Sequence, residues 1–431
     1  MTRGRLRLPL LVFAVACLVR VAAIAWFPGF GDDPSAQGDA IDYHALAVHM
    51  TQGHGYTLAW QGGGAHHGEL RFTALRPPVW PLTLAALYEA TGVSPGAARL
   101  LLVALDAATC ALLVVLGRML AGPKVGAVAG FAAAAYPPLW INVFRLHSDV
   151  LFTLIIVVAL CIAERVRQRP GARPAAVFGL VLGLLTLTRP NGVFLAAVLA
   201  ASLGSVAWRA LRASAVPVMA AAASGVLLLV VPWVALASAR VGAFVPITTQ
   251  GGPVLAGYYS PRLLDYGGTN YWGAWDVDRV GRILHAAPDE ATYLRRGQQA
   301  GLHFIRDHPG GAGELVGLHA LRYFDLYWQQ GGRLPLLWFP SVWRGANVLA
   351  VLAWWIAAPL ALVGLWRVRA APGRWAPALL VFATLAASSL LLGATPRLRS
   401  PSEPVVLLLA AVAVVGLTPR DESDSRGLRA A

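Results

Sequence analysis

The chain has 431 residues, of which 57% are hydrophobic and only 13% are charged, and its formal net charge is +14. A soluble domain carries about 25% charged residues, so this composition excludes a water-soluble globular protein and predicts that a lipid bilayer surrounds much of the chain. The basic residues do not indicate nucleic-acid binding, because they lie at the ends of apolar runs and not on one interleaved polar face.

Apolar stretches recur from one end of the chain to the other, and we interpret ten of them as membrane helices. They lie at residues 9–27, 97–120, 124–142, 148–163, 174–188, 192–208, 215–238, 346–366, 376–393 and 402–418. The sequence therefore predicts an all-α polytopic membrane protein with a single domain over residues 1–420 and a disordered cytoplasmic tail at 421–431. The apolar segment 79–92 is shorter and contains Pro81, so we expect it to be partly embedded or interfacial.

The basic residues of the short connections predict the orientation of the helices, because cytoplasmic loops carry an excess of Lys and Arg. They fall on one side if the chain begins in the cytoplasm and ten helices alternate, so we expect both termini in the cytoplasm of a multi-pass plasma-membrane protein. The N-terminal segment also resembles a signal peptide with a cleavage site at 23–25, but in a polytopic protein such a segment usually stays as the first helix. The basic residues concerned are Arg3, Arg5, Arg7, Arg118, Lys124, Arg165, Arg167, Arg169, Arg173, Arg209, Arg212, Arg367, Arg369, Arg374, Arg420, Arg426 and Arg429.

The extracytoplasmic side is expected to carry two long loops, residues 28–78 and 239–345, with short amphipathic helices. Loops of this length are uncommon unless they are functional, so we expect the polar chemistry on this side. The aromatic residues of the second loop could stack on a sugar or form an interfacial belt; they are Tyr258, Tyr259, Tyr266, Tyr271, Trp272 and Trp275. The first loop holds Asp32, Asp33, Asp39, Asp42, Glu69, His44, His49, His54, His66 and His67.

Two carboxylates open predicted helices on this outer side. Asp39 begins a short amphipathic helix that ends at Gly53 and shares a face with Tyr43. Asp149 follows His147 and Ser148 and opens a membrane helix at the outer rim. An aspartate at a helix start can act as an N-cap or be favoured by the helix dipole, so structural and catalytic explanations both stay open.

Several arginines oppose the topological bias. Arg189, Arg397 and Arg399 lie in outer turns, and guanidinium groups bind phosphate with a fork geometry. We expect an outer-leaflet lipid phosphate as their partner, with simple snorkelling to the headgroups as the alternative. Arg20 and Asp106 lie at similar depth inside predicted helices, and because charges in a membrane are expensive and usually paired, we expect them to pair in a structural role.

The order of short motifs along the chain carries a family resemblance. The motifs are Asp39-xxx-Tyr43-His44, Gly53-His54-Gly55-Tyr56, Arg76-Pro77-Pro78, Tyr136-Pro137-Pro138, His147-Ser148-Asp149, Arg189-Pro190, His308-Pro309 and Arg397-Leu398-Arg399. Together they cover nearly the whole chain and resemble bacterial members of the GT-C glycosyltransferase superfamily, the group that includes protein O-mannosyltransferases and lipid A aminoarabinose transferases. Many relatives have Ser-Glu where this chain has Ser148-Asp149, and an aromatic residue in place of Leu398.

The resemblance implies a glycosyltransferase that moves a sugar from a polyprenyl-phosphate donor to a lipid, glycan or protein hydroxyl on the extracytoplasmic face, with inversion. By position, Asp39 matches the general base and Asp149 the acidic residue that supports it. The sequence leaves a divalent cation open, with Asp39 and Asp149 as candidate ligands. The residues expected to bind substrate are Tyr43, His44, Arg76, His147, Arg189, Arg397 and Arg399.

A secondary transporter or lipid flippase is the main alternative function. Such proteins place ionisable groups near the membrane midplane, often in two repeated halves, whereas this chain shows no internal repeat and its polar groups gather at outer helix ends. A non-catalytic assembly protein would not need outer arginines in tight turns together with first-loop carboxylates.

Overall fold

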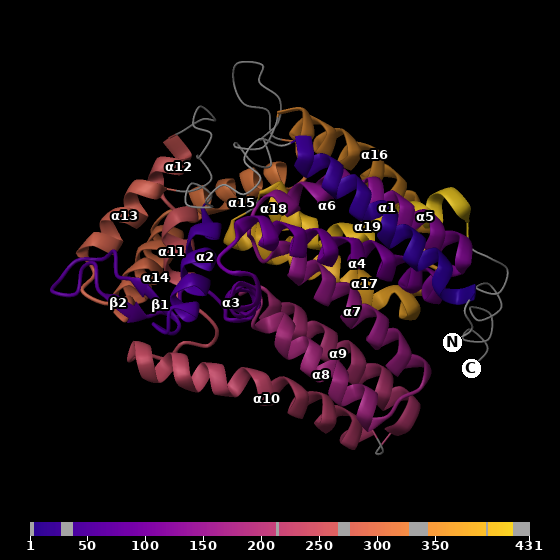
Figure 1. Ribbon diagram of the computed structural model, residues 1–431, viewed down its shortest axis with the longest axis horizontal. Coiled ribbons are helices and arrows are strands. Elements are labelled where there is room, and N and C mark those ends of the chain that lie inside the picture. Colours follow the sequence, from indigo (N-terminus) through magenta and orange to yellow (C-terminus); the bar gives the residue numbers. More distant parts are fainter. Residues whose placement is uncertain are drawn as a thin grey trace.

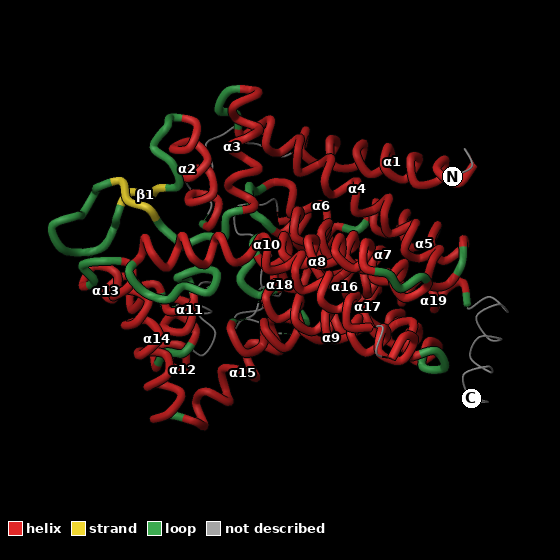
Figure 2. Tube along the Cα trace, turned by 90° about the horizontal axis from the view of Figure 1, so that it is seen from below, coloured by secondary structure: helices red, strands yellow, loops and turns green. Residues whose placement is uncertain are grey.

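The computed structural model describes residues 4–26, 38–212, 215–265, 276–326, 344–393 and 395–416. Long apolar helices form a bundle, and a group of shorter helices with one β-hairpin gathers at one end of it (Figure 1). Helix α1 begins, and helix α19 ends, at the opposite end of the bundle, as both views show (Figures 1 and 2).

The bundle confirms the prediction of a mostly helical polytopic protein, since a helix lies at each of the ten predicted spans. Seven of the described helices are long and apolar enough to cross a membrane, or eight if one bent pair counts as a single span. The count of ten therefore remains a prediction. The helices are α1 (Gly4–Trp26), α4 (Pro95–Ala121), α5 (Pro123–Ala135), α7 (Asp149–Gln168), α8 (Ala172–Thr186), α9 (Gly192–Leu211), α10 (Ala215–Val241), α16 (Arg344–Val368), α17 (Pro372–Leu392) and α19 (Glu403–Val415).

The shorter elements come mainly from the two predicted outer loops. Helix α3 (Val79–Thr91) occupies the segment predicted to be interfacial. Parts of the predicted loops, the residues from 266 to 275 among them, and the predicted tail lie outside the described residues. The other elements of this group are α2 (Asp39–Thr51), β1 (Thr57–Ala59), β2 (Leu70–Phe72), α11 (Gly251–Tyr258), α12 (Pro261–Asp265), α13 (Val277–Ala286), α14 (Glu290–Asp307) and α15 (Pro309–Tyr323).

Glycines allow two of these short helices to pack at very close range. Gly252 of α11 faces Gly297 of α14, and a Cβ atom on Gly297 would lie 2.4 Å from the backbone of Gly252. Only a residue without a side chain fits at such a backbone contact. The hairpin β1–β2 is antiparallel, with Thr57 opposite Phe72.

A break in the bundle explains the buried charge pair that the sequence predicts. Helix α5 is followed by α6 (Pro137–Trp140) and the 3-10 helix η2 (Ile141–Phe144), with a bend of 55°. The two prolines that open α6 lack the N–H groups that would bond the carbonyls of Ala133 and Ala134.

The guanidinium of Arg20 fills this gap. It donates to both carbonyl oxygens, at 3.1 Å for Ala133, and to Asp106 at 2.6 Å. Arg20 is fully buried. The predicted Arg20–Asp106 pair is therefore confirmed, and its cation also satisfies the backbone at the helix break.

We expect Arg20→Met and Asp106→Asn each to destabilise the protein by about 3–5 kcal/mol, because each leaves one buried charge without its partner. The double variant Arg20→Met/Asp106→Leu should lose less than the sum of the two, yet stay below the wild type because the Ala133 and Ala134 carbonyls keep no side-chain donor. Unfolding in a single detergent measures this, with Leu18→Met as a control because Leu18 is largely exposed on the same helix. Strictly additive losses would contradict the pairing.

Candidate active site

Three aspartates and three arginines from distant parts of the chain form one ion-pair cluster where the bundle meets the short helices. In Figure 1, α2 and the short helix α18 (Pro396–Arg399) lie between the bundle and helices α11–α14. The ion-pair cluster consists of Asp39 and Asp42 on α2, Arg76 before α3, Asp149 at the start of α7, Arg189 between α8 and α9, and Arg397 on α18.

Arg397 joins two of the carboxylates. Its Nη1 lies 2.8 Å from Oδ2 of Asp39, and its Nε lies 2.9 Å from Oδ2 of Asp149. The other oxygen of Asp149 accepts from Nη1 of Arg189 at 2.5 Å. Helices α2, α7 and α18 and the α8–α9 turn are thus tied together through these four side chains.

Arg76 is shared in the same way. Its Nη2 lies 2.9 Å from Asp39 and 2.8 Å from Asp42, and its Nε donates to Asp42 at 2.9 Å. Three positive and three negative side chains give the cluster no net formal charge. It is therefore already neutralised before any substrate binds.

The segment that carries Arg76 is held by hydrogen bonds from three other elements. The Tyr56 hydroxyl donates to the carbonyl of Arg76 at 2.9 Å, and the Thr248 hydroxyl donates to Leu75 at 2.6 Å. The N–H of Val79 donates to Leu187 at 3.1 Å, two residues before Arg189. The backbone therefore fixes the Arg76 side of the cluster relative to Arg189.

The capping explanation does not account for the side chain of Asp39. The N-cap of α2 is Gly38, whose φ of 63° suits glycine, and no side chain caps the helix. The Asp39 carboxylate turns instead to Arg76 and Arg397. Burial alone would raise the pKa of Asp39, but these two guanidinium groups outweigh it and hold the pKa well below its usual value.

Two more of the predicted site residues, Tyr43 and His147, lie beside the ion-pair cluster. The Tyr43 hydroxyl shares a hydrogen bond with Ser148 at 3.2 Å, and Arg76 lies over its ring at 5.5 Å. His147 lies 3.9 Å from Asp149, and burial, followed by the nearby Arg397, lowers its pKa to about 3, so its imidazole is neutral.

His44 lies apart from the cluster, because its Nδ1 shares a hydrogen bond with the Tyr88 hydroxyl at 2.9 Å. Tyr88 lies on the neighbouring helix α3.

Arg399 also lies outside the ion-pair cluster, contrary to the expectation that it faces lipid phosphate. It is fully buried, donates to Glu403 at 2.7 Å and Asp325 at 2.8 Å, and stacks on Trp354 at 3.6 Å. The reason is geometric: residues two apart on a helix do not share a face, so Arg397 and Arg399 point apart. The spacing of Arg399 and Glu403 was the sequence signal for this pair.

Asp42, a member of the ion-pair cluster, was not predicted as a site residue, and Tyr258 was expected only as one of the aromatic residues that could stack on a sugar. Asp42 is one helical turn after Asp39, and this spacing was a usable signal. Tyr258 packs against Gly393, where a Cβ would meet its ring; burial, and then the charge of Asp39, raises its pKa to about 12. No local pattern in the sequence links Tyr258 to the cluster.

A divalent cation does not fit the residues present. Within the described residues, no group of three or more His, Cys, Asp and Glu side chains could hold a metal. Asp39 and Asp149 both turn their oxygens to the guanidinium of Arg397, whereas hard cations prefer a shell of about six oxygen ligands. A guanidinium thus occupies the position between the two candidate ligands.

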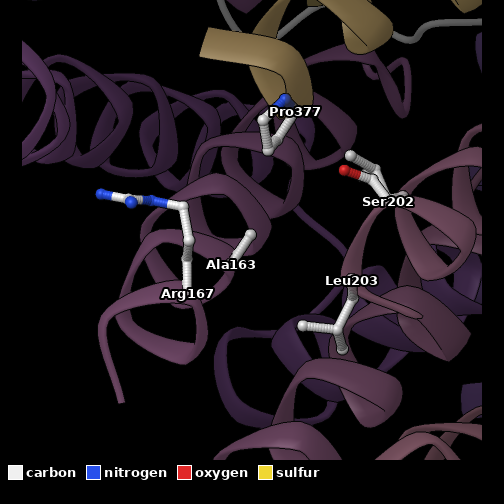
Figure 3. Close-up of a pocket in the computed structure, with 6 residues that line it drawn as sticks. Ala163, Arg167, Ser202, Leu203 and Pro377 are labelled. Atoms are coloured by element: carbon white, nitrogen blue, oxygen red, sulfur yellow. The ribbon is translucent and has the colours of Figure 1, made fainter. Parts of the chain in front are cut away.

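A small hollow between α7, α9 and α17 is separate from the ion-pair cluster (Figure 3). It lies near helix ends that the arginine pattern assigns to the cytoplasm, and no residue of the cluster lines it. Its lining residues are Ala163, Arg167, Leu199, Ser202, Leu203 and Pro377.

The fold is similar to that of an archaeal oligosaccharyltransferase. AglB from Archaeoglobus fulgidus, solved in complex with an inhibitory peptide and a dolichol-phosphate, matches with a TM-score of 0.58 and 12% identity over 99% of this chain. An Archaeoglobus fulgidus oligosaccharyltransferase tethered to an acceptor peptide gives 0.55 and 13%, covering 98% of this chain and 53% of the other. The chain has the GT-C fold. The comparison therefore confirms, for the fold, the resemblance that the sequence motifs indicated.

The chain spans about half the length of these oligosaccharyltransferases, 55% in the case of AglB. ArnT from Cupriavidus metallidurans bound to undecaprenyl phosphate gives a lower TM-score of 0.44, at 15% identity over 94% of this chain and 77% of ArnT. No family model and no curated protein matches the chain.

We expect Arg399→Ala to be much more destabilising than Arg397→Ala. Removal of Arg399 leaves Asp325 and Glu403 buried without their cation, which costs about 3–5 kcal/mol, whereas Asp39 keeps Arg76 and Asp149 keeps Arg189 when Arg397 is removed. Unfolding of both variants in detergent measures the difference, and Arg399→Lys should fall between Arg399→Ala and the wild type. Equal stability of the two alanine variants would contradict this assignment.

Proposed function

We propose that the protein is an inverting glycosyltransferase that moves a sugar from a polyprenyl-phosphate donor to a hydroxyl acceptor at the extracytoplasmic membrane surface. The observation that carries the proposal is the ion-pair cluster, which brings a partly exposed carboxylate and phosphate-binding groups together at one end of an apolar bundle. A lipid-linked phosphate reaches such a position from the bilayer while a polar acceptor reaches it from water.

Exposure assigns different roles to the two predicted acids. The side chain of Asp39 is 29% exposed, whereas that of Asp149 is 1% exposed behind Arg189 and Arg397. A general base must come within hydrogen-bond reach of the proton that it accepts. Asp39 is therefore the base, and Asp149 holds the two arginines in position.

The arginines supply the phosphate site. The Nε of Arg189 is buried and has no hydrogen-bond partner in the part of the chain that the structure describes. Such an orphaned donor is costly, and the guanidinium of Arg189, which is 11% exposed, would satisfy it by turning to a phosphate oxygen. Arg397, 16% exposed, lies on the other side of Asp149 and can bind the same phosphate.

The transfer is a direct displacement at the anomeric carbon of the sugar. The acceptor oxygen forms the new bond to this carbon while its proton passes to Asp39. The bond to the phosphate oxygen breaks, and its electron pair stays on the lipid phosphate, whose growing negative charge Arg189 and Arg397 stabilise. Attack opposite the leaving group inverts the anomeric configuration.

The transporter alternative has less support. Transporters place exchangeable ionisable groups near the midplane, but the Arg20–Asp106 pair inside the bundle is fully buried and bonded to the backbone at a helix break. The partly exposed carboxylates of the ion-pair cluster, Asp39 and Asp42, lie at the bundle end instead.

We expect Asp39→Asn to reduce sugar transfer by about 10²–10⁴-fold, because the amide cannot accept the proton. The assay uses purified protein, labelled polyprenyl-phosphate sugars from extracted lipids, and the control Glu69→Gln, which removes an exposed outer-loop carboxylate paired with His66. A loss below about tenfold with normal expression would exclude Asp39 as the base. If the wild type transfers no sugar from any such donor, the proposed function is wrong.

The proposed side of the membrane can be tested separately. A cysteine at position 66 should react with an impermeant maleimide in intact cells, whereas a cysteine at position 169 should react only after the cells are opened, because of the arginine asymmetry. The unmodified chain, with Cys17, Cys110 and Cys161, serves as the background control. Labelling of position 169 in intact cells would reverse the orientation.

A further inference from the structure

We propose that Arg397 couples the two halves of the transfer, because Asp39 and the lipid phosphate compete for this one guanidinium. When Asp39 takes the acceptor proton, it releases Arg397 to the departing phosphate. This inference rests on the proposed function and adds to it a shared cation and a defined sequence of ion pairs.

The pattern of ion pairs makes Asp39 the exchangeable member of the cluster. Its two partners, Arg76 and Arg397, each hold a second carboxylate, Asp42 and Asp149 respectively. If Asp39 loses its charge, both arginines stay paired. By contrast, Asp149 is the only carboxylate that Arg189 contacts among the described residues, so loss of the Asp149 charge would leave a cation unpaired.

Arg397 can change partners without any change in its backbone. Asp149 holds its Nε from the buried side, while its Nη1 reaches the partly exposed Asp39. Two residues further, Arg399 fixes the end of α18 through Asp325 and Glu403. Only the outer part of the Arg397 side chain therefore has to turn from carboxylate to phosphate.

The charges balance through the step. The donor phosphodiester carries one negative charge, and the cluster carries three positive and three negative charges. After transfer, Asp39 is neutral and the lipid phosphate monoester can carry a second negative charge. The charge lost at Asp39 thus reappears at the phosphate, and a cation shared by both sites stabilises it without reorganisation of the surrounding helices.

The same sharing adjusts the strength of the base. With Arg76 and Arg397 both attached, Asp39 attracts protons weakly. A donor phosphate that competes for Arg397 weakens the hold of this guanidinium on Asp39, which makes Asp39 a stronger base in the donor complex before the proton transfer completes the release.

The test measures binding of undecaprenyl phosphate to the full-length protein in detergent micelles, with uncharged undecaprenol as the lipid control. Asp39→Asn mimics the protonated base and should bind undecaprenyl phosphate about tenfold more tightly than the wild type, with no change for undecaprenol. Glu69→Gln, which removes an outer-loop charge away from the cluster, should leave the Kd unchanged.

A double-variant cycle isolates the role of Arg397. In an Arg397→Gln background, Asp39→Asn should no longer tighten binding, because the shared cation is gone. If Arg397→Gln does not fold, Arg397→Lys replaces it, and the coupling should then be smaller than with arginine. Thermal unfolding of each variant confirms that a folded protein is measured.

An unchanged or weaker affinity in Asp39→Asn overturns the inference, and so does equal tightening with and without Arg397, which would mean a general charge effect. In both cases the proposed function still holds if the wild type binds undecaprenyl phosphate more tightly than undecaprenol. A wild type that binds both lipids equally overturns the proposed function and this inference together.

Discussion

The structure depends on the pairing of arginines within an apolar bundle, where an unpaired charge is expensive. Arg20, Arg397 and Arg399 each contact a carboxylate and at least one further acceptor. Because their partners come from distant parts of the chain, such as Asp39 for Arg397, each arginine also fixes how helices lie against one another. Buried charges are rare in membrane proteins, but in this protein the ion pairs that they form fix how the helices pack against one another.

The same interaction has two different consequences on the short helix α18. Arg399 is fully buried between Asp325, Glu403 and Trp354 and serves the packing of the bundle. Arg397 reaches the edge of the bundle and the partly exposed Asp39. A rigid pair thus supports an exchangeable one, because the backbone between them is shared. This arrangement gives a reactive group a fixed position and a movable partner, as catalysis requires.

The sequence predicts those features that depend on local pattern. Apolar runs locate the helices of the bundle, the similar depth of Arg20 and Asp106 predicts that they pair, and helix starts mark Asp39 and Asp149. The i,i+4 spacing of Arg399 and Glu403 was a usable local signal. The contact of Arg399 with Asp325, 74 positions away, could not be predicted from local pattern. The contacts of Arg397, to partners 358 and 248 positions away, depend on tertiary packing and have no trace in the sequence. The partner of His44 on α3 was unpredictable for the same reason.

The low pKa of Asp39 conflicts at first with its role as a base, since an effective base has a pKa near the working pH. The conflict disappears when the cause of the low pKa is considered. Burial favours the protonated form of Asp39, and Arg76 and Arg397 are the main groups that oppose it. If one arginine turns to a phosphate, one of the two main charges that lower the pKa of Asp39 is weakened, and the pKa rises. The environment that suits a base is thus already built into the fold, and the arginines mask it until an anionic substrate competes for one of them.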